Sequence, residues 1–277
     1  MNDERDFSQS QKVTYFFVGV GKCGTSWLYE FLKRHNILSL PSLKEPYLID
    51  KSPSKQQIII DKLYSRNIKM SDFSNVYYWD VENPKKIYDY NSAAKIIITV
   101  RTPSKRIISH FGFLKRNGMI HEETIGEYLL NEDSFHIVAR SYYKDMIERY
   151  VAKFGEENVL ILPLEQLENT PQFYANRLLD FLDEPRVELT DNDIKPVLKS
   201  ARARNLFVTK FAKHVALILR TWGLLSLLGR LKSSKLIRLA LFNSIDQSSQ
   251  GVSFGNKTKE IARLDQEYSE FLSRISG

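Results

Sequence analysis

Residues 19–27 constrain the fold more than any other segment, because three glycines there join a strand pattern directly to a helix pattern. The preceding run 13–20 (VTYFFVGV) is short, apolar and rich in β-branched and aromatic residues, which predicts a buried strand. Apolar residues then recur at helical spacing from Trp27 to Leu32, which predicts a helix ending near Arg34. A glycine turn at such a junction aims successive N–H groups at one point and is typical of an anion site.

The rest of the chain continues this alternation of strands and helices. Further strands are expected at 37–43, 95–100 and 158–163, with a weaker one at 75–79. Further helices are expected at 103–117, 136–154 and 171–182, and the pattern beyond Pro185 is almost entirely helical, including 253–275. The fold class predicted is therefore α/β, with a mainly parallel sheet flanked by helices on both faces and a helical C-terminal extension. We expect one domain over 1–277, with an α/β core at 13–185 and a mostly helical part at 186–277 that closes the site.

Cysteine content and hydropathy limit the cellular locations that are expected for this protein. The single cysteine, Cys23, excludes a disulfide or a cysteine-based metal cluster within one chain, so a reducing, cytoplasmic location is expected. Residues 1–11 are polar and mixed in charge, which does not resemble a secretory signal. The longest apolar candidate, 215–228, is interrupted by Arg220 and falls short of the roughly 18 apolar residues of a membrane span.

Positive charge is concentrated in one segment. Residues 195–238 hold 11 of the 40 Lys and Arg and no Asp or Glu, although the net charge of the whole chain is only +7. Such a segment favours an anionic partner. Within it, 207–242 mixes basic residues with Leu, Ile and Trp222. This fits a core helix pair with a solvated basic face, or a helix that docks on a membrane surface or on a substrate that accepts a transferred group. A nucleic-acid partner is not expected, because no recognised binding motif accompanies the charge.

The glycine loop differs from the loop of nucleoside triphosphatases. That motif, G-x-x-x-x-G-K-[ST], has its lysine directly after the second glycine. Gly19 and Gly24 have this spacing, but Thr25 occupies the lysine position and the lysine lies upstream at Lys22. A nucleotide or small-molecule kinase is therefore the second hypothesis, weakened by this order and by the lack of a clear Mg²⁺-binding aspartate after a strand.

The loop instead resembles the 5′-phosphosulfate loop of sulfotransferases, commonly P-K-S-G-T-T-W. The matching residues are Gly21, Lys22, Cys23, Gly24, Thr25, Ser26 and Trp27, with Gly for Pro, Cys for Ser and Ser for the second Thr. This resemblance implies binding of the donor 3′-phosphoadenosine-5′-phosphosulfate (PAPS), with adenosine 3′,5′-bisphosphate (PAP) as its product and no metal. No clustered metal-ligand motif such as H-E-x-x-H is found in the sequence.

A second anion site is expected where the 95–100 strand ends. Arg101 follows this strand and Ser109 lies eight residues later, so a guanidinium and a hydroxyl could hold one phosphate. This arrangement resembles the sulfotransferase 3′-phosphate motif, a strand followed by Arg-x-Pro and then by Ser eight residues after the Arg. Lys199 and Arg202 lie where the family usually closes a late basic loop over the same phosphate.

Glu45 is the candidate general base. It lies in 44–50 (KEPYLID), close in sequence to the loop, although the residues alone favour a solvated surface glutamate. The stretch resembles the Lys-Glu-Pro-His-Phe-Phe-Asp segment of heparan-sulfate-type (N- and 3-O-) sulfotransferases and their bacterial relatives, in which the glutamate is the proposed base. Tyr47 replaces the histidine of that segment. The resemblance implies in-line sulfuryl transfer to a hydroxyl or amine of a glycan, lipid, carrier-bound or small-molecule acceptor, with Lys22 stabilising the developing charge. A non-catalytic nucleotide- or membrane-binding protein is the third hypothesis.

Overall fold

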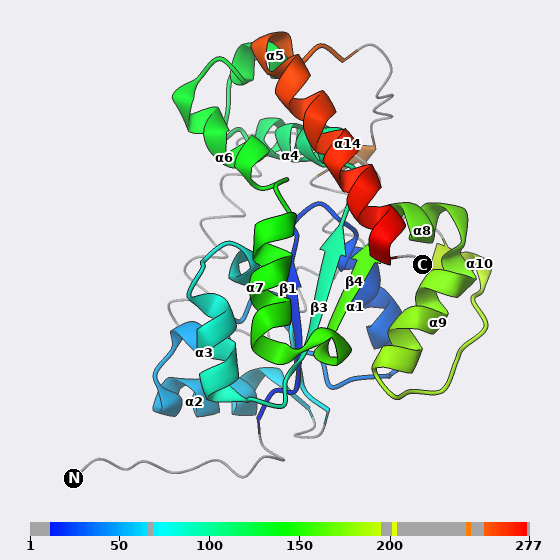
Figure 1. The fold of residues 1–277 in the computed structure, drawn as a ribbon. Coiled ribbons are helices and arrows are strands. Elements are labelled where there is room, and N and C mark those ends of the chain that lie inside the picture. Colours follow the sequence, from blue (N-terminus) through cyan, green and yellow to red (C-terminus); the bar gives the residue numbers. More distant parts are fainter. Residues whose placement is uncertain (1–11, 66–68, 195–200, 204–241, 245–251, 276–277) are drawn as a thin grey trace.

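A computed structural model describes residues 12–65, 69–194, 201–203, 242–244 and 252–275. Its centre is a four-stranded sheet in the order β2-β1-β3-β4 (Figure 1). The strands are β1 (Tyr15–Gly19), β2 (Ser71–Asp72), β3 (Lys95–Val100) and β4 (Val159–Pro163). Every neighbouring pair is parallel, with Tyr15 opposite Lys95 and Ile96 opposite Val159. This confirms the α/β class predicted from the alternation of strands and helices.

Helices cover both faces of the sheet and gather beyond its carboxyl edge. They are α1 (Thr25–Arg34), α2 (Pro53–Leu63), α3 (Asn83–Tyr90), α4 (Pro103–Arg116), α5 (Ile125–Tyr128), α6 (Phe135–Ala139), α7 (Lys144–Phe154), α8 (Leu164–Asn169), α9 (Pro171–Phe181), α10 (Asp191–Ile194) and α14 (Thr258–Ile275). In Figure 1, α3 and α7 lie over one face, α1 and α9 lie toward the other, and α4, α5, α6 and α14 lie beyond the strand ends. None of the helices in the described ranges is long and apolar enough to cross a bilayer.

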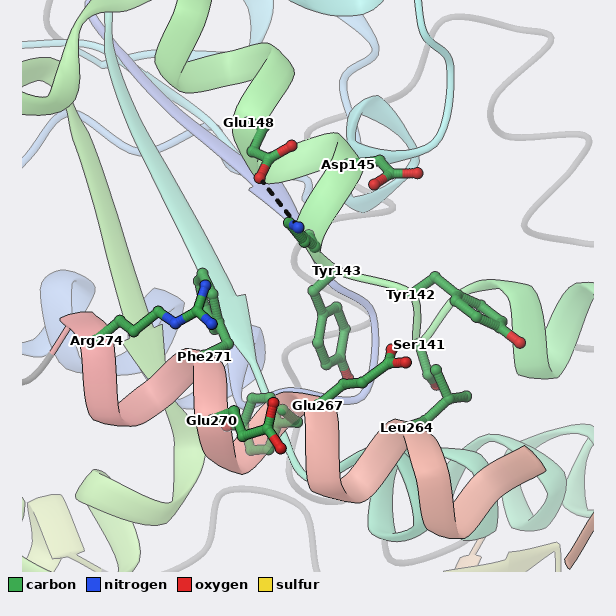
Figure 2. A pocket seen from close by; sticks show the side chains of 12 residues that line it. Ser141, Tyr142, Tyr143, Asp145, Glu148, Leu264, Glu267, Glu270, Phe271 and Arg274 are labelled. Atoms are coloured by element: carbon green, nitrogen blue, oxygen red, sulfur yellow. Dashed lines mark ion pairs between the residues drawn. The ribbon is translucent and has the colours of Figure 1, made fainter. Parts of the chain in front are cut away.

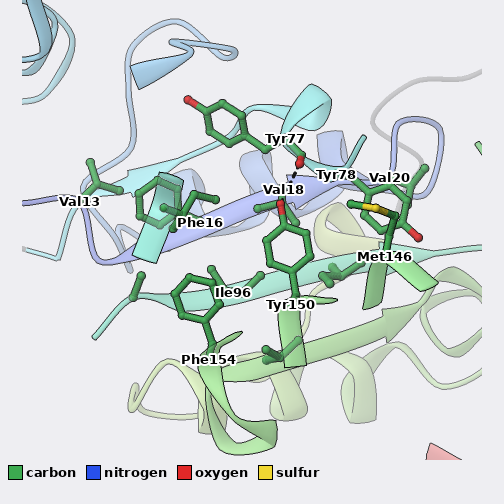
Figure 3. Close-up of a cluster of buried hydrophobic side chains, with 14 of the residues drawn as sticks. Val13, Phe16, Val18, Val20, Tyr77, Tyr78, Ile96, Met146, Tyr150 and Phe154 are labelled. Carbon is green, nitrogen blue, oxygen red and sulfur yellow. Dashed lines mark hydrogen bonds between the residues drawn. The ribbon is translucent and has the colours of Figure 1, made fainter. Parts of the chain in front are cut away.

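Alternation along β1 explains why this strand is apolar throughout. Phe16 and Val18 point into the cluster beneath α3 and α7, whereas Tyr15 and Phe17 point into the cluster beneath α1 and α9. Figure 3 shows Phe16, Val18 and Ile96 in the first of these clusters, together with Tyr150 of α7. Burying such a side chain contributes about 1.5–3 kcal/mol, so both faces together fix β1 at the centre of the sheet. The loop that follows β1 therefore starts from a rigid strand.

Two strand predictions were wrong. Residues 75–79 form not a strand but the 3₁₀ helix η3 (Asn75–Tyr78), whose N–H of Tyr77 bonds the Ser74 carbonyl. Residues 37–43 make only one bridge, Ser39 to Met70, and the edge beside β1 is occupied by the unpredicted strand β2. In both segments apolar and aromatic residues pack into the core, but the backbone forms no ladder of hydrogen bonds with a neighbouring strand. The strand-like composition of these segments therefore misled the prediction.

Two helix predictions also need correction. The helix expected over 136–154 is divided into α6 and α7, because Ser141 between them accepts a hydrogen bond from the buried Arg106 side chain (Nε–Oγ 2.7 Å). The part beyond Pro185 is not almost entirely helical, since β5 (Ala201–Ala203) pairs with β6 (Phe242–Ser244) in antiparallel register. The last helix is present as α14, preceded by the short 3₁₀ helix η6 (Gly255–Lys257).

Candidate functional site

The loop after β1 is anchored to its neighbours before it turns. The N–H of Val20 donates to the Thr99 carbonyl of β3 at 2.8 Å, and the Thr99 hydroxyl donates to the Gly19 carbonyl at 3.1 Å. Gly19 has φ +135°, and a Cβ there would lie 2.9 Å from the Asn75 carbonyl oxygen of η3. Only glycine allows this close approach, which presses η3 against the start of the loop.

Helix α1 presents a free N-terminus to the loop. Gly24 precedes it in the left-handed conformation, with φ 90°, and no side chain caps the helix. The first N–H groups of a helix lack intrahelical partners, and the ten residues of α1 add the positive end of its dipole. The loop therefore presents backbone donors in an arrangement that can bind an anion.

Lys22 is held against α4 rather than among acidic groups. Its backbone is left-handed (φ 77°), and its Nζ lies 4.7 Å from the centroid of the Phe113 ring. Burial, together with the positive charge of Arg116, lowers the pKa of Lys22 to about 8. An anionic ligand would restore the charged form of this lysine, which gives it a strong electrostatic preference for such a ligand.

Other predicted loop residues serve as anchors in this structure. Cys23 is fully buried, and burial raises the pKa of its thiol to about 12. Trp27 is also buried: its ring stacks on Phe31 at 4.8 Å, and its Nε1 donates to the Asp193 carbonyl at 2.6 Å. Thr25 is buried and Ser26 is half-buried in the first turn of α1. These contacts hold the N-terminus of α1 in place.

Arg101 lies at the end of β3, beside the end of β1. Its Nη2 is 3.6 Å from Glu168 Oε1 of α8, while its Nε is buried and has no hydrogen-bond partner among the described residues. A buried guanidinium N–H without a partner is costly unless a ligand accepts from it. Tyr143 donates to the Arg101 carbonyl at 2.7 Å, which fixes the backbone at this point.

The other residues predicted for the second anion site are placed in part. Ser109 lies half-buried on α4, the helix that begins two residues after Arg101. Arg202 lies in β5, and this strand contacts α4. Lys199 falls outside the described residues. The structure thus brings the segments that carry Arg101, Ser109 and Arg202 to the same helix, α4.

Glu45 is joined to the loop through η3. Asn75 Nδ2 donates to Glu45 Oε1 at 2.7 Å, and Asn75 is the residue whose carbonyl touches Gly19. The Glu45 N–H also donates to the Phe73 carbonyl at 3.0 Å. The neighbouring Lys44 donates to the carbonyl of Thr25, in the first turn of α1, at 3.3 Å. Burial lowers the pKa of Lys44 to about 8.

A buried acid organises the turn that carries Glu45. Asp72 accepts from Ser74 Oγ at 2.5 Å, from the Tyr77 hydroxyl at 3.1 Å and from the Leu48 N–H at 3.3 Å. The N–H groups on either side of Leu48 donate to Ser74 Oγ and to the Tyr77 hydroxyl, each at 3.1 Å. Burial raises the pKa of Asp72 to about 7, against the effect of these hydrogen bonds. Three successive N–H groups are thereby tied to the carboxyl end of β2.

A cavity of about 520 Å³ lies apart from these residues, between the N-terminal end of α7 and helix α14. Figure 2 shows Tyr143 and Phe271 in it, with the carboxylates of Asp145 and Glu267 nearby. Its lining includes neither the loop nor Glu45. The described ranges contain no group of three or more His, Cys, Asp or Glu side chains that could hold a metal ion.

A family model described as the sulfotransferase domain matches residues 14–219, about three quarters of the chain, and this range includes the loop, Glu45, Arg101 and Ser109. The chain belongs to the sulfotransferase family. No curated protein matches its sequence.

Solved sulfotransferases share the fold at low identity. A sulfotransferase from Alicyclobacillus acidocaldarius superposes with a TM-score of 0.59 at 19% identity, covering 76% of this chain and 92% of that one. The sulfotransferase domain of the Synechococcus PCC 7002 olefin synthase gives a TM-score of 0.50 at 14% identity, covering 96% and 98%. A mouse sulfotransferase complexed with PAP gives 0.47 at 19% identity, covering 68% and 63%.

Sequence reasoning missed several residues in and around the candidate site. Asn75 was assigned to a strand, so its contact with Glu45 was not anticipated, and Lys44, although part of the 44–50 segment, was given no role. Arg106, inside the segment that resembles the 3′-phosphate motif, is 1% exposed and bonds the Ser141 hydroxyl. An arginine on the buried face of a predicted helix was the available signal for this last residue.

Proposed function

We propose that this sulfotransferase moves a sulfuryl group from PAPS to a hydroxyl or amine of its acceptor. The observation that carries the proposal is the pairing of two anion sites at the ends of adjacent strands. The uncapped N-terminus of α1 and Lys22 follow β1, and Arg101 follows β3. Ligands of open α/β sheets bind at this edge.

The residues fit the two anionic ends of such a donor. A Cβ at Gly21 would meet no atom of the described residues within 4 Å, which leaves room beside the loop backbone for a phosphosulfate. Lys22 makes no ion pair with a carboxylate among the described residues, and Arg101 has a buried Nε without a partner there. Lys22, Thr25 and Ser26 would hold the phosphosulfate, and Arg101 and Ser109 the 3′-phosphate. Lys199 and Arg202 remain proposed partners of the 3′-phosphate.

Bound there, the donor supplies the sulfuryl group and leaves as PAP with the electron pair of the broken sulfur–oxygen bond. Glu45, oriented by Asn75, would take the proton of the acceptor hydroxyl or amine as its oxygen or nitrogen bonds to sulfur. Lys22 and the N–H groups of α1 would stabilise the negative charge that develops on the oxygens. This role requires Lys22 to carry its proton, which holds below its pKa of about 8.

The acceptor is a glycan, a lipid, a carrier-bound group or a small molecule in this proposal. Segment 207–242 is proposed to contact a membrane surface or the acceptor, and all of it except Phe242 lies outside the described residues. We propose no nucleic-acid partner, and we propose the cytoplasm as the compartment because Cys23 is the only cysteine of the chain.

Calorimetry with PAP and with ATP–Mg²⁺ tests the donor. We expect PAP to bind and ATP–Mg²⁺ to bind more weakly; the opposite order would favour a kinase and overturn the proposal. Incubation with ³⁵S-labelled PAPS and fractionated cell extract tests the transfer itself. Lys22→Ala and Glu45→Gln are expected to lower the labelling rate strongly, and full activity in both variants would remove their catalytic roles.

A further inference from the structure

A short element links the proposed base to a second group of side chains. η3 begins with Asn75, which holds Glu45, and it is followed by Trp79. The Cζ of Arg140 lies 5.1 Å from the Trp79 ring centroid. The partner of Glu45 is therefore the first residue of η3, and the ring that contacts Arg140 follows the last residue of η3.

Helix α4 connects this region with the loop after β1. Arg106 Nη1 lies 3.4 Å from His110 Nδ1, and one turn further along α4 the Phe113 ring supports Lys22. The pKa of His110 is lowered to about 3 by burial and by the positive charges of Arg106, Arg140 and Lys22. Three positive charges thus act on one imidazole, and the Arg106 guanidinium lies directly beside it.

No carboxylate neutralises these cations within the part of the chain that the structure describes. Lys22, Arg116 and Arg140 form no ion pair with Asp or Glu in the described ranges, whereas the nearby Asp80 is already paired with Lys86 at 3.0 Å. Of the residues outside the described ranges, 195–200 and 204–241 contain no Asp or Glu, and the acids of the remaining ones are Asp3, Glu4, Asp6 and Asp246. A concentration of unpaired positive charge is unfavourable in the free protein and favours an anionic ligand.

The donor does not account for all of this charge. Its phosphosulfate is assigned to Lys22 and the loop, and its 3′-phosphate to Arg101 with Ser109. Arg106 is buried and uses its guanidinium on Ser141 and on the Ile137 carbonyl, which is a structural role. Arg140 remains: it is half-buried, its Cζ lies 5.1 Å from the Trp79 ring centroid, and it makes no ion pair with a carboxylate among the described residues.

On the basis of the sulfuryl transfer proposed above, we propose that the acceptor carries a negatively charged group, a carboxylate, phosphate or sulfate, and that Arg140 on Trp79 binds it. Arg116, beside Lys22, adds to the positive field that the acceptor enters. The anionic group anchors one end of the acceptor at Arg140, and its hydroxyl or amine is thereby placed at Glu45. Arg140 is accordingly a specificity-determining residue, and it takes no part in the proton transfer.

Charge fractionation of the acceptor pool tests this inference. An extract of the source cells is divided on an anion exchanger at pH 7 into bound, anionic compounds and unbound, neutral or cationic ones. Each fraction is incubated with the protein and ³⁵S-labelled PAPS, and label is expected in compounds from the bound fraction. The same assay then compares Arg140→Gln and Arg140→Lys with Lys144→Gln, a matched control whose side chain is 70% exposed.

We expect Arg140→Gln to raise the KM for the bound fraction about tenfold, with kcat and PAP affinity within about twofold of wild type. Arg140→Lys should recover part of this loss, which a merely structural role would not produce. Label in unbound compounds, or an Arg140→Gln KM equal to that of the control, would overturn the inference. Label in neither fraction, or a wild-type protein that fails to bind PAP, would instead overturn the proposed function.

Discussion

The pKa of Lys22 makes donor binding depend on pH in a range that is easily measured. Burial and the charge of Arg116 lower this pKa to about 8 in the free protein, so Lys22 is charged below pH 8 and neutral above it. A phosphosulfate or phosphate at the loop favours the charged lysine and raises its pKa in the complex. PAP affinity should therefore be fully present near pH 7 and should be lost as the pH rises through 8.

The size of the effect follows from the charged fraction. Lys22 is roughly nine-tenths charged at pH 7 and one-tenth charged at pH 9, so the apparent Kd for PAP should rise about tenfold between them. The second ionisation of a phosphate lies near pH 6 and does not contribute over this range. Calorimetric titration with PAP from pH 6.5 to 9.5 measures the change directly.

Lys22→Arg provides the matched comparison, because a guanidinium stays charged throughout this range. Its PAP affinity should be nearly independent of pH between 7 and 9. The pKa of Lys44 is also lowered to about 8, and Lys44 is present in both proteins. Any pH dependence of PAP affinity that both proteins share therefore comes from Lys44 or from other groups, not from Lys22. Equal slopes for wild type and Lys22→Arg would refute the placement of Lys22 beside the bound phosphate.

Three further outcomes are expected. Asn75→Ala removes the 2.7 Å hydrogen bond to Glu45 and should lower the transfer rate about tenfold, with PAP affinity unchanged by calorimetry; a loss of PAP affinity would contradict the role of Asn75. Gly24→Ala places a side chain at φ +90° and should lower the free energy of unfolding in urea by about 1–2 kcal/mol, whereas Gly21→Ala, with open space around it, should not. Arg101→Lys should reduce the preference for PAP over adenosine 5′-monophosphate about tenfold; an unchanged preference would show that Arg101 does not hold the 3′-phosphate.

Local patterns predicted the central part of the fold. The 13–20 run became β1 because both of its faces are apolar, and 95–100 became β3 for the same reason. The glycines of the loop marked the junction with α1, because a left-handed residue such as Gly24 suits few other side chains. Each of these features is encoded within about ten residues, so the order of the chain alone reveals it.

The sequence misled where local composition and tertiary packing disagree. Aromatic residues over 75–79 favour a strand, but Tyr77 and Tyr78 are buried on a 3₁₀ helix because η3 is tied to Asp72 and pressed against Gly19. The apolar period over 136–154 is continuous, yet the bond from Arg106 to Ser141 falls where α6 ends and the chain redirects. Neither structure can be predicted from its own segment, because each depends on residues outside that segment. Ser141 bonds Arg106, 35 residues away, and η3 bonds Asp72 of β2 and packs against Gly19 of β1.

By itself the sequence determined a parallel α/β sheet with a glycine loop after its first strand and an arginine at the end of a second strand. It did so because strand and helix periods, glycine conformations and charge type are properties of short segments. Only the tertiary structure decided that Asn75 donates a hydrogen bond to Glu45, and that Arg140 contacts the Trp79 ring at the other end of η3. These pairs come from separate loops at one edge of the sheet, and their meeting depends on how the helices pack around the core.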